Sequence, residues 1–454
     1  MGKLFGSNGV RGVANQDFTL ELASCLAASA GSLLGKEMAV GRDGRLTSPM
    51  FRDAIVSALL SIGCNVHDFG ITTTPALQYM ISRSDLMGGI MITASHNPPQ
   101  FNGVKVMFRD GVEVPKTMET EIEILVDKGG PPSCDWNEVG VVSYHDYVDE
   151  YTDAIMNHVD CEAIKKAELS VALDLGNGAA AITAPILASK LGCKVYTLNS
   201  EIDGAFPGRG SEPTPENLTD LKALIKATDA DIGIGFDGDG DRSIIIDEKT
   251  EAVWGDKILS LVANEFLKTH PGDTIVTAIS SSPSLEKVAA KYGSKVHWTK
   301  VGSVLVSRAM VENGYLLGGE ENGGIMYGPF LPVRDGCMAM ALLLNYMATS
   351  GKLLSELIAE QPQLYKDKDK TPCPNELKDL VLKRMVGMVD APEINTLDGV
   401  KLVYGDDSWV LFRPSGTEPI FRIYAESESP ERVKELIDKH KILVKSIVDE
   451  LNAA

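Results

Sequence analysis

Three features that many proteins have in quantity are scarce in this sequence: paired cysteines, long apolar runs and positive charge. No two of the seven cysteines have the C-x-x-C spacing of zinc sites and redox motifs; they are Cys25, Cys64, Cys134, Cys161, Cys193, Cys337 and Cys373. This odd, scattered set favours reduced thiols, and residues 1–6 do not look like a secretory signal, so we expect a cytoplasmic protein. No apolar run approaches the roughly 20 residues that cross a bilayer, so we expect no membrane partner.

The shortage of positive charge narrows the choice of partner. Asp and Glu number 63 against 43 Lys and Arg, which gives a formal net charge of −20. A broadly acidic surface repels nucleic acid, so we expect no nucleic-acid partner. It would also repel a small phosphorylated substrate, so any phosphate site must bring its own cations. Loops that contain arginine or lysine are therefore the places to examine.

Predicted strands and helices alternate through most of the chain. Residues 38–40, 65–69 and 89–93 read as strands, and residues 51–62 read as a helix between the first two. The same alternation returns over residues 169–198 and again over residues 274–299. It predicts an α/β fold of three similar, mixed βαβ domains, at residues 1–150, 151–253 and 254–362.

The last part of the chain has a different pattern. Residues 361–375 are rich in Pro, Lys and Asp and are expected to form a linker. A helix and three strands should follow, and then a long final helix with Ser429 as N-cap and Pro430 at its first position. We expect residues 363–454 to form an α+β domain.

Ser95 lies in a polar loop, residues 93–98, directly after a short buried strand. Ligands of open α/β sheets gather at the carboxyl ends of strands, so Ser95 is a candidate nucleophile. His96 is its neighbour, but adjacent side chains on an extended chain point to opposite faces, and a simple Ser–His pair is not expected. An ordinary polar turn is the alternative.

Asp237, Asp239 and Asp241 alternate with glycine in a loop between two apolar runs. Three carboxylates at every second residue can converge on one hard cation, and Mg²⁺ is favoured because it needs few protein carboxylates. The spacing to Glu248 also fits a calcium-binding EF-hand. However, Arg242 stands where that loop needs glycine, and its flanks read as strands instead of helices. A solvated acidic turn is the third reading.

Two further loops could contact a phosphorylated sugar. Glu320 and Asn322 lie in a glycine-rich run, where carboxylate and amide groups suit hydroxyl groups; a plain surface turn is an equal alternative. The loop at residues 413–419 could bind an anion through its arginine, its hydroxyls and its backbone N–H groups. Its candidate residues, with one from the next strand, are Arg413, Ser415, Gly416, Thr417 and Arg422.

Taken in order, these loops resemble the α-D-phosphohexomutase superfamily. The resemblance covers the whole chain and includes Phe-Gly-Ser-Asn-Gly-Val-Arg-Gly at residues 5–12 and Asn-Gly-Val-Lys at residues 102–105. It implies three α/β mutase domains and a C-terminal domain similar to TATA-binding protein, arranged around a central cleft. It also implies that Ser95 is a phosphoserine whose phosphate binds the metal, expected to be Mg²⁺, together with Asp237, Asp239 and Asp241. Hexose 1,6-bisphosphate is then the intermediate and activator.

The resemblance also implies the roles of other residues. Arg11, Lys105 and Lys300 match basic residues around the transferring phosphate and are the candidates for general acid and base. The residues implied to bind substrate are His96, Arg242, Glu320, Asn322, Arg413, Ser415, Gly416, Thr417 and Arg422. Many relatives carry serine at the position of Asn322 and histidine at that of Gly324, so this chain resembles archaeal members and its acid and base stay open.

The expected function is transfer of a phosphoryl group between C1 and C6 of a small-molecule hexose phosphate. The motifs lean towards phosphoglucosamine mutase, with phosphomannomutase/phosphoglucomutase as the alternative. A metal-dependent sugar phosphatase and a non-catalytic sugar-phosphate sensor are further alternatives. The sequence allows a monomer or a homodimer.

Overall fold

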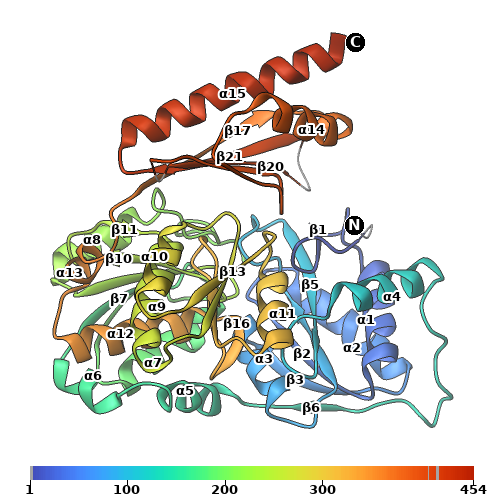
Figure 1. Ribbon diagram of the computed structural model, residues 1–454. Coiled ribbons are helices and arrows are strands. Elements are labelled where there is room, and N and C mark those ends of the chain that lie inside the picture. The colour runs from blue at the N-terminus through green and yellow to red at the C-terminus, as the bar shows by residue number, and fades with distance from the viewer. Residues whose placement is uncertain (1–3, 407, 416–418, 454) are drawn as a thin grey trace.

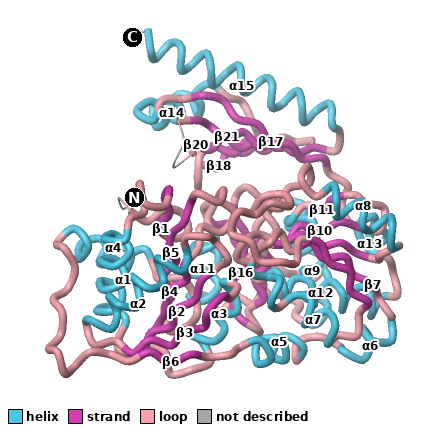
Figure 2. Tube along the Cα trace, turned by 180° about the vertical axis from the view of Figure 1, so that it is seen from behind, coloured by secondary structure: helices cyan, strands magenta, loops and turns pink. Residues whose placement is uncertain are grey.

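Four β-sheets with their helices make up the fold of this computed structural model, which describes residues 4–406, 408–415 and 419–453. Three sheets share one body, and the fourth lies above it in the view, together with the C-terminus (Figure 1). The view from behind shows the same arrangement of the four sheets (Figure 2). None of the helices in these described ranges has the length and hydropathy needed to cross a bilayer.

Unit I is built on a six-stranded sheet with the order β1-β5-β4-β2-β3-β6. Its strands are β1 (Val10–Val13), β2 (Glu37–Arg42), β3 (Asn65–Ile71), β4 (Gly88–Ile92), β5 (Phe101–Phe108) and β6 (Val142–Tyr144), and its helices are α1 (Leu20–Leu34), α2 (Ser48–Ser61), α3 (Thr74–Ser82) and α4 (Lys116–Asp127). β2 runs parallel to β3 and β4, whereas β5 runs antiparallel to β4 and β1, so the sheet is mixed as predicted. The run Gly-Gly-Ile-Met-Ile of β4 is buried throughout, as expected for a central strand.

Unit II has the sheet order β11-β10-β9-β7-β8. Its elements are α5 (Val148–Met156), α6 (Cys161–Ala167), β7 (Ser170–Asp174), η1 (Ala179–Ile182), α7 (Ala184–Lys190), β8 (Lys194–Leu198), α8 (Thr219–Thr228), β9 (Ile232–Phe236), β10 (Ser243–Asp247) and β11 (Ala252–Val253). The sequence pattern over residues 180–191 predicts a single helix, but the segment divides at Thr183 into η1 and α7. Pro185 explains the division, because proline fits the first turn of a helix and not its interior.

Unit III has the sheet order β13-β12-β14-β15-β16. Its elements are α9 (Gly255–Thr269), β12 (Thr274–Ala278), α10 (Ser284–Ala290), β13 (Lys295–Thr299), α11 (Ser303–Asn313), β14 (Leu317–Gly319), β15 (Ile325–Tyr327), β16 (Leu331–Arg334), α12 (Gly336–Ser350) and α13 (Leu354–Ala359). α12 packs against α5, α6 and α7 of unit II. One hydrophobic core includes Leu77, Leu173 and Leu344, and so joins units I, II and III into one body.

Unit IV has an antiparallel sheet with the order β17-β21-β20-β19-β18. Its elements are β17 (Tyr365–Pro372), η2 (Asn375–Leu377), α14 (Lys378–Met388), β18 (Glu393–Asn395), β19 (Val400–Val403), β20 (Trp409–Pro414), β21 (Ile420–Ser427) and α15 (Pro430–Ala453). The predicted cap of the last helix is present, because Ser429 Oγ accepts a hydrogen bond of 3.1 Å from the Arg432 amide. Unit IV has its own core, and a small cluster around Ile279 and Trp409 packs it on unit III.

The predicted linker at residues 361–375 is wrong. Eight of those residues form β17, which pairs along its length with β21, from Tyr365 opposite Ser427 to Pro372 opposite Ile420. The Lys-Asp alternation hid this strand because β17 is the outermost strand of its sheet and most of its side chains are exposed. Charged side chains are common on such edges, where backbone hydrogen bonds hold the strand in place.

Candidate active site

Three of the predicted loops follow the carboxyl ends of strands in three different units. Ser95 lies just beyond β4, Asp237 directly after β9, and Glu320 directly after β14. Strand ends of α/β sheets are where ligands bind, and packing of units I, II and III into one body brings these ends together. The residues of one candidate site therefore come from loops of three different sheets.

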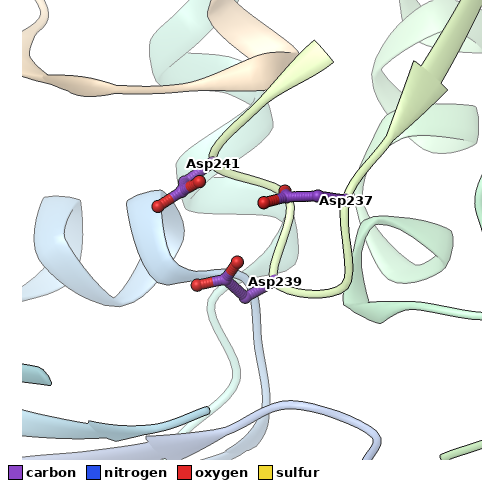
Figure 3. A group of neighbouring side chains, drawn as sticks. All are labelled: Asp237, Asp239 and Asp241. Atoms are coloured by element: carbon purple, nitrogen blue, oxygen red, sulfur yellow. The ribbon is translucent and has the colours of Figure 1, made fainter. Parts of the chain in front are cut away.

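The carboxylates of Asp237, Asp239 and Asp241 face one another in the loop between β9 and β10 (Figure 3). One oxygen of each lies within 4.8 Å of the others, and all three residues are buried. The Oδ1 atoms of Asp239 and Asp241 have no hydrogen-bond partner. Buried acceptors without partners are costly, so this donor set fits a hard divalent cation.

The EF-hand alternative fails on two grounds. β9 and β10, which flank the loop, are paired antiparallel strands and not helices. Glu248, the residue at the last ligand position, instead accepts hydrogen bonds from the amide and hydroxyl of Ser355. The buried carboxylates also exclude a solvated acidic turn.

Lys105 of β5 reaches from unit I into the aspartate cluster. Its Nζ lies 2.6 Å from Asp239 Oδ2 and 2.7 Å from Asp241 Oδ2. Burial alone would lower the pKa of Lys105, but the two carboxylates outweigh it and raise that pKa. Burial and the nearby carboxylates of Asp241 and Asp239 raise the pKa of Asp237 well above its usual value. The Oδ1 atoms of Asp239 and Asp241, which have no hydrogen-bond partner, stay available to a cation beside Lys105.

Ser95 is buried and adjoins this cluster. Its Oγ donates a hydrogen bond of 3.1 Å to Asp237 Oδ2, and its φ of +51° is left-handed. The expectation that His96 would point to the opposite face is wrong, because the backbone at Ser95 is not extended. His96 Nδ1 instead lies 3.5 Å from Ser95 Oγ. Burial, reinforced by Arg242 and Arg11, lowers the pKa of His96, so its imidazole is neutral.

Arg45, which the sequence analysis did not identify, holds the serine loop. It is fully buried, and its guanidinium donates to four backbone carbonyls, those of Ser95 and Asn97 at 2.7 Å, Pro98 at 2.8 Å and Phe101 at 3.0 Å. Its Nε pairs with Asp43 at 3.1 Å. This one side chain therefore fixes the path of the chain around the nucleophile candidate.

Arg11 of β1 also contacts the serine loop. Its Nη1 donates to Ala94 O at 3.2 Å and to Asn97 Oδ1 at 2.9 Å. Burial lowers the pKa of Arg11 to about 10, although Asp239 acts in the opposite direction, so Arg11 stays a cation at neutral pH. Arg242 adds a second cation: its Nε is buried, has no hydrogen-bond partner and lies 3.9 Å from both Asp237 and Asp241. A buried donor without a partner fits an anionic ligand.

Glu320 joins the aspartate cluster through Arg334, which the sequence analysis also did not identify. Arg334, at the end of β16, donates from Nη1 to Glu320 Oε2 at 3.2 Å and from Nη2 to Asp241 Oδ2 at 2.5 Å. Asn322 is half-buried in the same loop, where its Oδ1 accepts a hydrogen bond of 3.3 Å from the Gly324 amide. No motif could have indicated Arg334, since its partners lie in other loops.

The remaining predicted residues lie outside this buried cluster. Lys300 is exposed just after β13. On unit IV, Arg413 and Arg422 face each other across β20 and β21, and Arg413 Nε pairs with Asp398 at 2.7 Å. The backbone carbonyl of Ser415 accepts a hydrogen bond of 2.5 Å from Lys378 Nζ. Gly416 and Thr417 lie outside the described residues.

Family models match nearly the whole chain. They are described as Phosphoglucomutase/phosphomannomutase, with alpha/beta/alpha domain I at residues 2–131, domain II at 149–251, domain III at 254–365 and the C-terminal domain at 366–441.

Curated relatives and solved structures give the same picture. The chain is 43% identical to a phosphoglucomutase/phosphomannomutase of Thermococcus kodakarensis, over 96% of this chain and 97% of the relative. It is 39% identical to a phosphoglucosamine/phosphogalactosamine mutase of Sulfurisphaera tokodaii, over 98% and 99%. A crystal structure of a phosphoglucomutase/phosphomannomutase family protein from Burkholderia thailandensis aligns with a TM-score of 0.87 at 28% identity, over 97% of each chain.

Proposed function

Because the chain belongs to the phosphoglucomutase/phosphomannomutase family of hexose phosphate mutases, we propose that it moves a phosphoryl group between C1 and C6 of a hexose through phosphorylated Ser95. One observation carries this assignment of the nucleophile. Ser95 Oγ lies 3.1 Å from a carboxylate of the buried aspartate cluster, in a loop fixed by Arg45. A serine in that place has cationic groups on several sides, which phosphoryl transfer needs.

The proposed cycle begins with the phosphorylated serine. The free hydroxyl of a hexose monophosphate attacks the phosphorus, the bond from phosphorus to Ser95 Oγ breaks, and the hydroxyl proton passes to a base of the site. The product is a hexose 1,6-bisphosphate, which turns over within the site. Ser95 Oγ, which took up a proton when it left the phosphorus, gives that proton to the base and attacks the phosphorus of the other phosphate. The bond from that phosphorus to the sugar oxygen breaks, and the sugar oxygen takes up the proton. This restores the phosphoserine and leaves the isomer. Lys105 and Arg11 stay next to the reacting groups and are the proposed proton carriers and charge-stabilising residues.

The aspartate cluster fits Mg²⁺, which we propose is held by Asp237, Asp239, Asp241 and the phosphate on Ser95. When bound, the ion neutralises charge on phosphate oxygens during transfer. Burial and then the charges of Asp241 and Asp239 raise the pKa of Asp237, and a bound cation would offset this repulsion.

Other residues are proposed to hold the sugar phosphate. Glu320 and Asn322 would bind hydroxyl groups of the ring, and the loop of unit IV would bind the phosphate that is not reacting. The full proposed substrate set is His96, Arg242, Glu320, Asn322, Arg413, Ser415, Gly416, Thr417 and Arg422. Lys300, which is exposed just after β13, stays a candidate for the general acid or base with Lys105 and Arg11. A cytoplasmic location and a monomeric or homodimeric state stay predictions.

We propose glucosamine phosphate as the preferred sugar. One relative named phosphoglucosamine/phosphogalactosamine mutase, at 39% identity, and two named probable phosphoglucosamine mutase, at 38% and 35%, match the chain over nearly its full length. Glucose and mannose phosphates are the second candidates, favoured by the 43% identity to the Thermococcus kodakarensis phosphoglucomutase/phosphomannomutase. A comparison of kcat/KM for the three sugar phosphates, with Mg²⁺ and a trace of hexose bisphosphate, separates the two.

The test of the nucleophile is Ser95→Ala, with Ser446→Ala on the exposed face of α15 as the control. We expect Ser95→Ala to abolish sustained isomer formation, followed by phosphorus NMR, while the melting temperature stays near that of the parent. Mass spectrometry should find phosphate on the peptide with residue 95 in the control and not in the variant. Sustained turnover by Ser95→Ala would remove this serine from the mechanism. Release of inorganic phosphate without any isomer would instead identify a phosphatase.

A further inference from the structure

Gly324 leaves room for the side chain of another residue. A Cβ added at Gly324 would lie 2.2 Å from Cδ and 2.7 Å from Cγ of Arg334, far closer than atoms can approach. The backbone of Gly324 is not left-handed, so conformation does not require glycine here. Space does: the stem of Arg334 occupies the volume that any side chain at position 324 would need.

The guanidinium that passes through this space connects two loops of the site. Arg334 is 5% exposed; it bonds Asp241 of the metal-ligand loop in unit II and Glu320 of the sugar loop in unit III. Arginine suits this position because its planar fork presents several donors in fixed directions. Lysine would offer a single nitrogen, whereas Arg334 contacts Glu320 and Asp241 through two different nitrogens.

We propose that Arg334 is a positioning residue that couples the sugar loop to the aspartate cluster. Position 324 is then glycine because a larger side chain there would collide with Arg334. The inference rests on the proposed function, in which Glu320 binds the sugar and Asp241 binds the metal. The positively charged side chain of Arg334, at the end of β16, therefore occupies the space into which a side chain at position 324 would project. Both ends of the Arg334 guanidinium are bound by carboxylates, so Arg334 positions these groups and balances their charge.

This coupling has two consequences that a merely structural arginine would not have. The guanidinium of Arg334 neutralises part of the negative charge of Asp241. Removal of Arg334 should therefore leave the aspartate cluster more negative and tighten its binding of a divalent cation. Arg334 also restrains the carboxylate of Glu320, so its removal should lower kcat or raise KM for the sugar phosphate. Misplacing a substrate-binding group by about 1 Å costs roughly 100-fold in rate.

The test is a double-mutant cycle of Gly324→Ala and Arg334→Ala, with Gly387→Ala as the control. Gly387 lies in α14 with nothing within 4 Å of its added Cβ, so its variant should keep parental activity. We expect Gly324→Ala to lower kcat/KM by roughly 10- to 100-fold, because the new methyl group displaces Arg334. In the Arg334→Ala background the same change should alter kcat/KM by less than about twofold, since the space is then free.

Titration calorimetry with Mg²⁺ gives a second measurement that needs no turnover. Gly324→Ala and Arg334→Ala should each tighten Mg²⁺ binding several-fold, whereas Gly387→Ala should not. Arg334→Gln, which keeps length and polarity without charge, serves if Arg334→Ala does not fold, and should also tighten Mg²⁺ binding.

The possible results distinguish a failure of this inference from a failure of the proposed function. Independent, multiplying effects of the two changes on kcat/KM, or unchanged Mg²⁺ affinity in both variants, would overturn the coupling. A parent protein without mutase activity would instead overturn the proposed function, while the Mg²⁺ titrations would still decide whether Arg334 acts on the aspartate cluster.

Discussion

Replacement of Arg45 by methionine tests how the serine loop is held. Arg45 is fully buried, and its guanidinium binds four backbone carbonyls and Asp43. Methionine keeps much of the apolar volume and removes every donor. Asp43 would then be a buried carboxylate without its cation, although Ser48 and Thr93 would still donate to it.

The expected loss is large because a charge is left buried. Removal of one partner from a buried ion pair costs about 3–5 kcal/mol. Because units I, II and III share one hydrophobic core, they should melt together, and each kcal/mol should lower their melting temperature by about 2 °C, for a total fall of roughly 5–10 °C. Burial already raises the pKa of Asp43 in the parent, and loss of Arg45 should raise it further. When the pKa of a carboxyl is higher in the folded state than in the unfolded state, the free energy of unfolding falls as pH rises through the folded pKa. The loss of melting temperature in Arg45→Met should therefore be smaller at pH 5 than at pH 8.

Differential scanning calorimetry at the two pH values measures this effect. Arg384→Met is the matched control, since Arg384 forms an exposed ion pair with Glu450 that should contribute less than about 1 kcal/mol. Adding Asp43→Asn to Arg45→Met should recover part of the loss by removing the unpaired charge. A melting temperature within about 2 °C of the parent at pH 8, or a deficit independent of pH, would refute this account of Arg45.

Three further predictions follow from the site and from unit IV. Asp239→Asn should weaken Mg²⁺ binding and lower mutase activity by at least roughly 100-fold, which calorimetry and a coupled assay can check; unchanged Mg²⁺ affinity would exclude it as a ligand. Arg413→Ala should mainly raise KM for the sugar phosphate, with kcat less affected, and an unchanged KM would contradict a phosphate-binding role. Burial lowers the pKa of Lys401 to about 7, so above pH 7 the folded state binds fewer protons than the unfolded state. Stability should therefore rise from pH 7 to 9, and Lys401→Met should reduce that rise; equal pH profiles would exclude Lys401 as its source.

Much of this fold could be predicted from residue patterns that extend over only a few positions. The strands before Ser95 and Asp237 are short apolar runs, and each functional loop follows its strand directly. The aspartate ligands also lie within a single loop, where alternation with glycine allows their side chains to converge. All these features depend on neighbours within a few residues, and such neighbours can be read from the sequence.

β17 shows where that reading failed. Its residues alternate lysine and aspartate, and a strand with so little apolar character cannot be recognised by hydrophobic periodicity. It is a strand because the backbone groups of β21 are available on one side, about 50 residues later in the chain.

Arg45 and Arg334 are the residues that only the tertiary structure could identify. Arg45 finds carbonyls some 50 residues away, and Arg334 finds Asp241 in another unit, 93 positions earlier. The sequence by itself determined which loops carry carboxylates, hydroxyls and glycines, because local backbone geometry sets those. Tertiary packing decided which buried cations neutralise and orient them, because a charge taken out of water pairs with whatever opposite charge the folded chain brings within hydrogen-bonding distance.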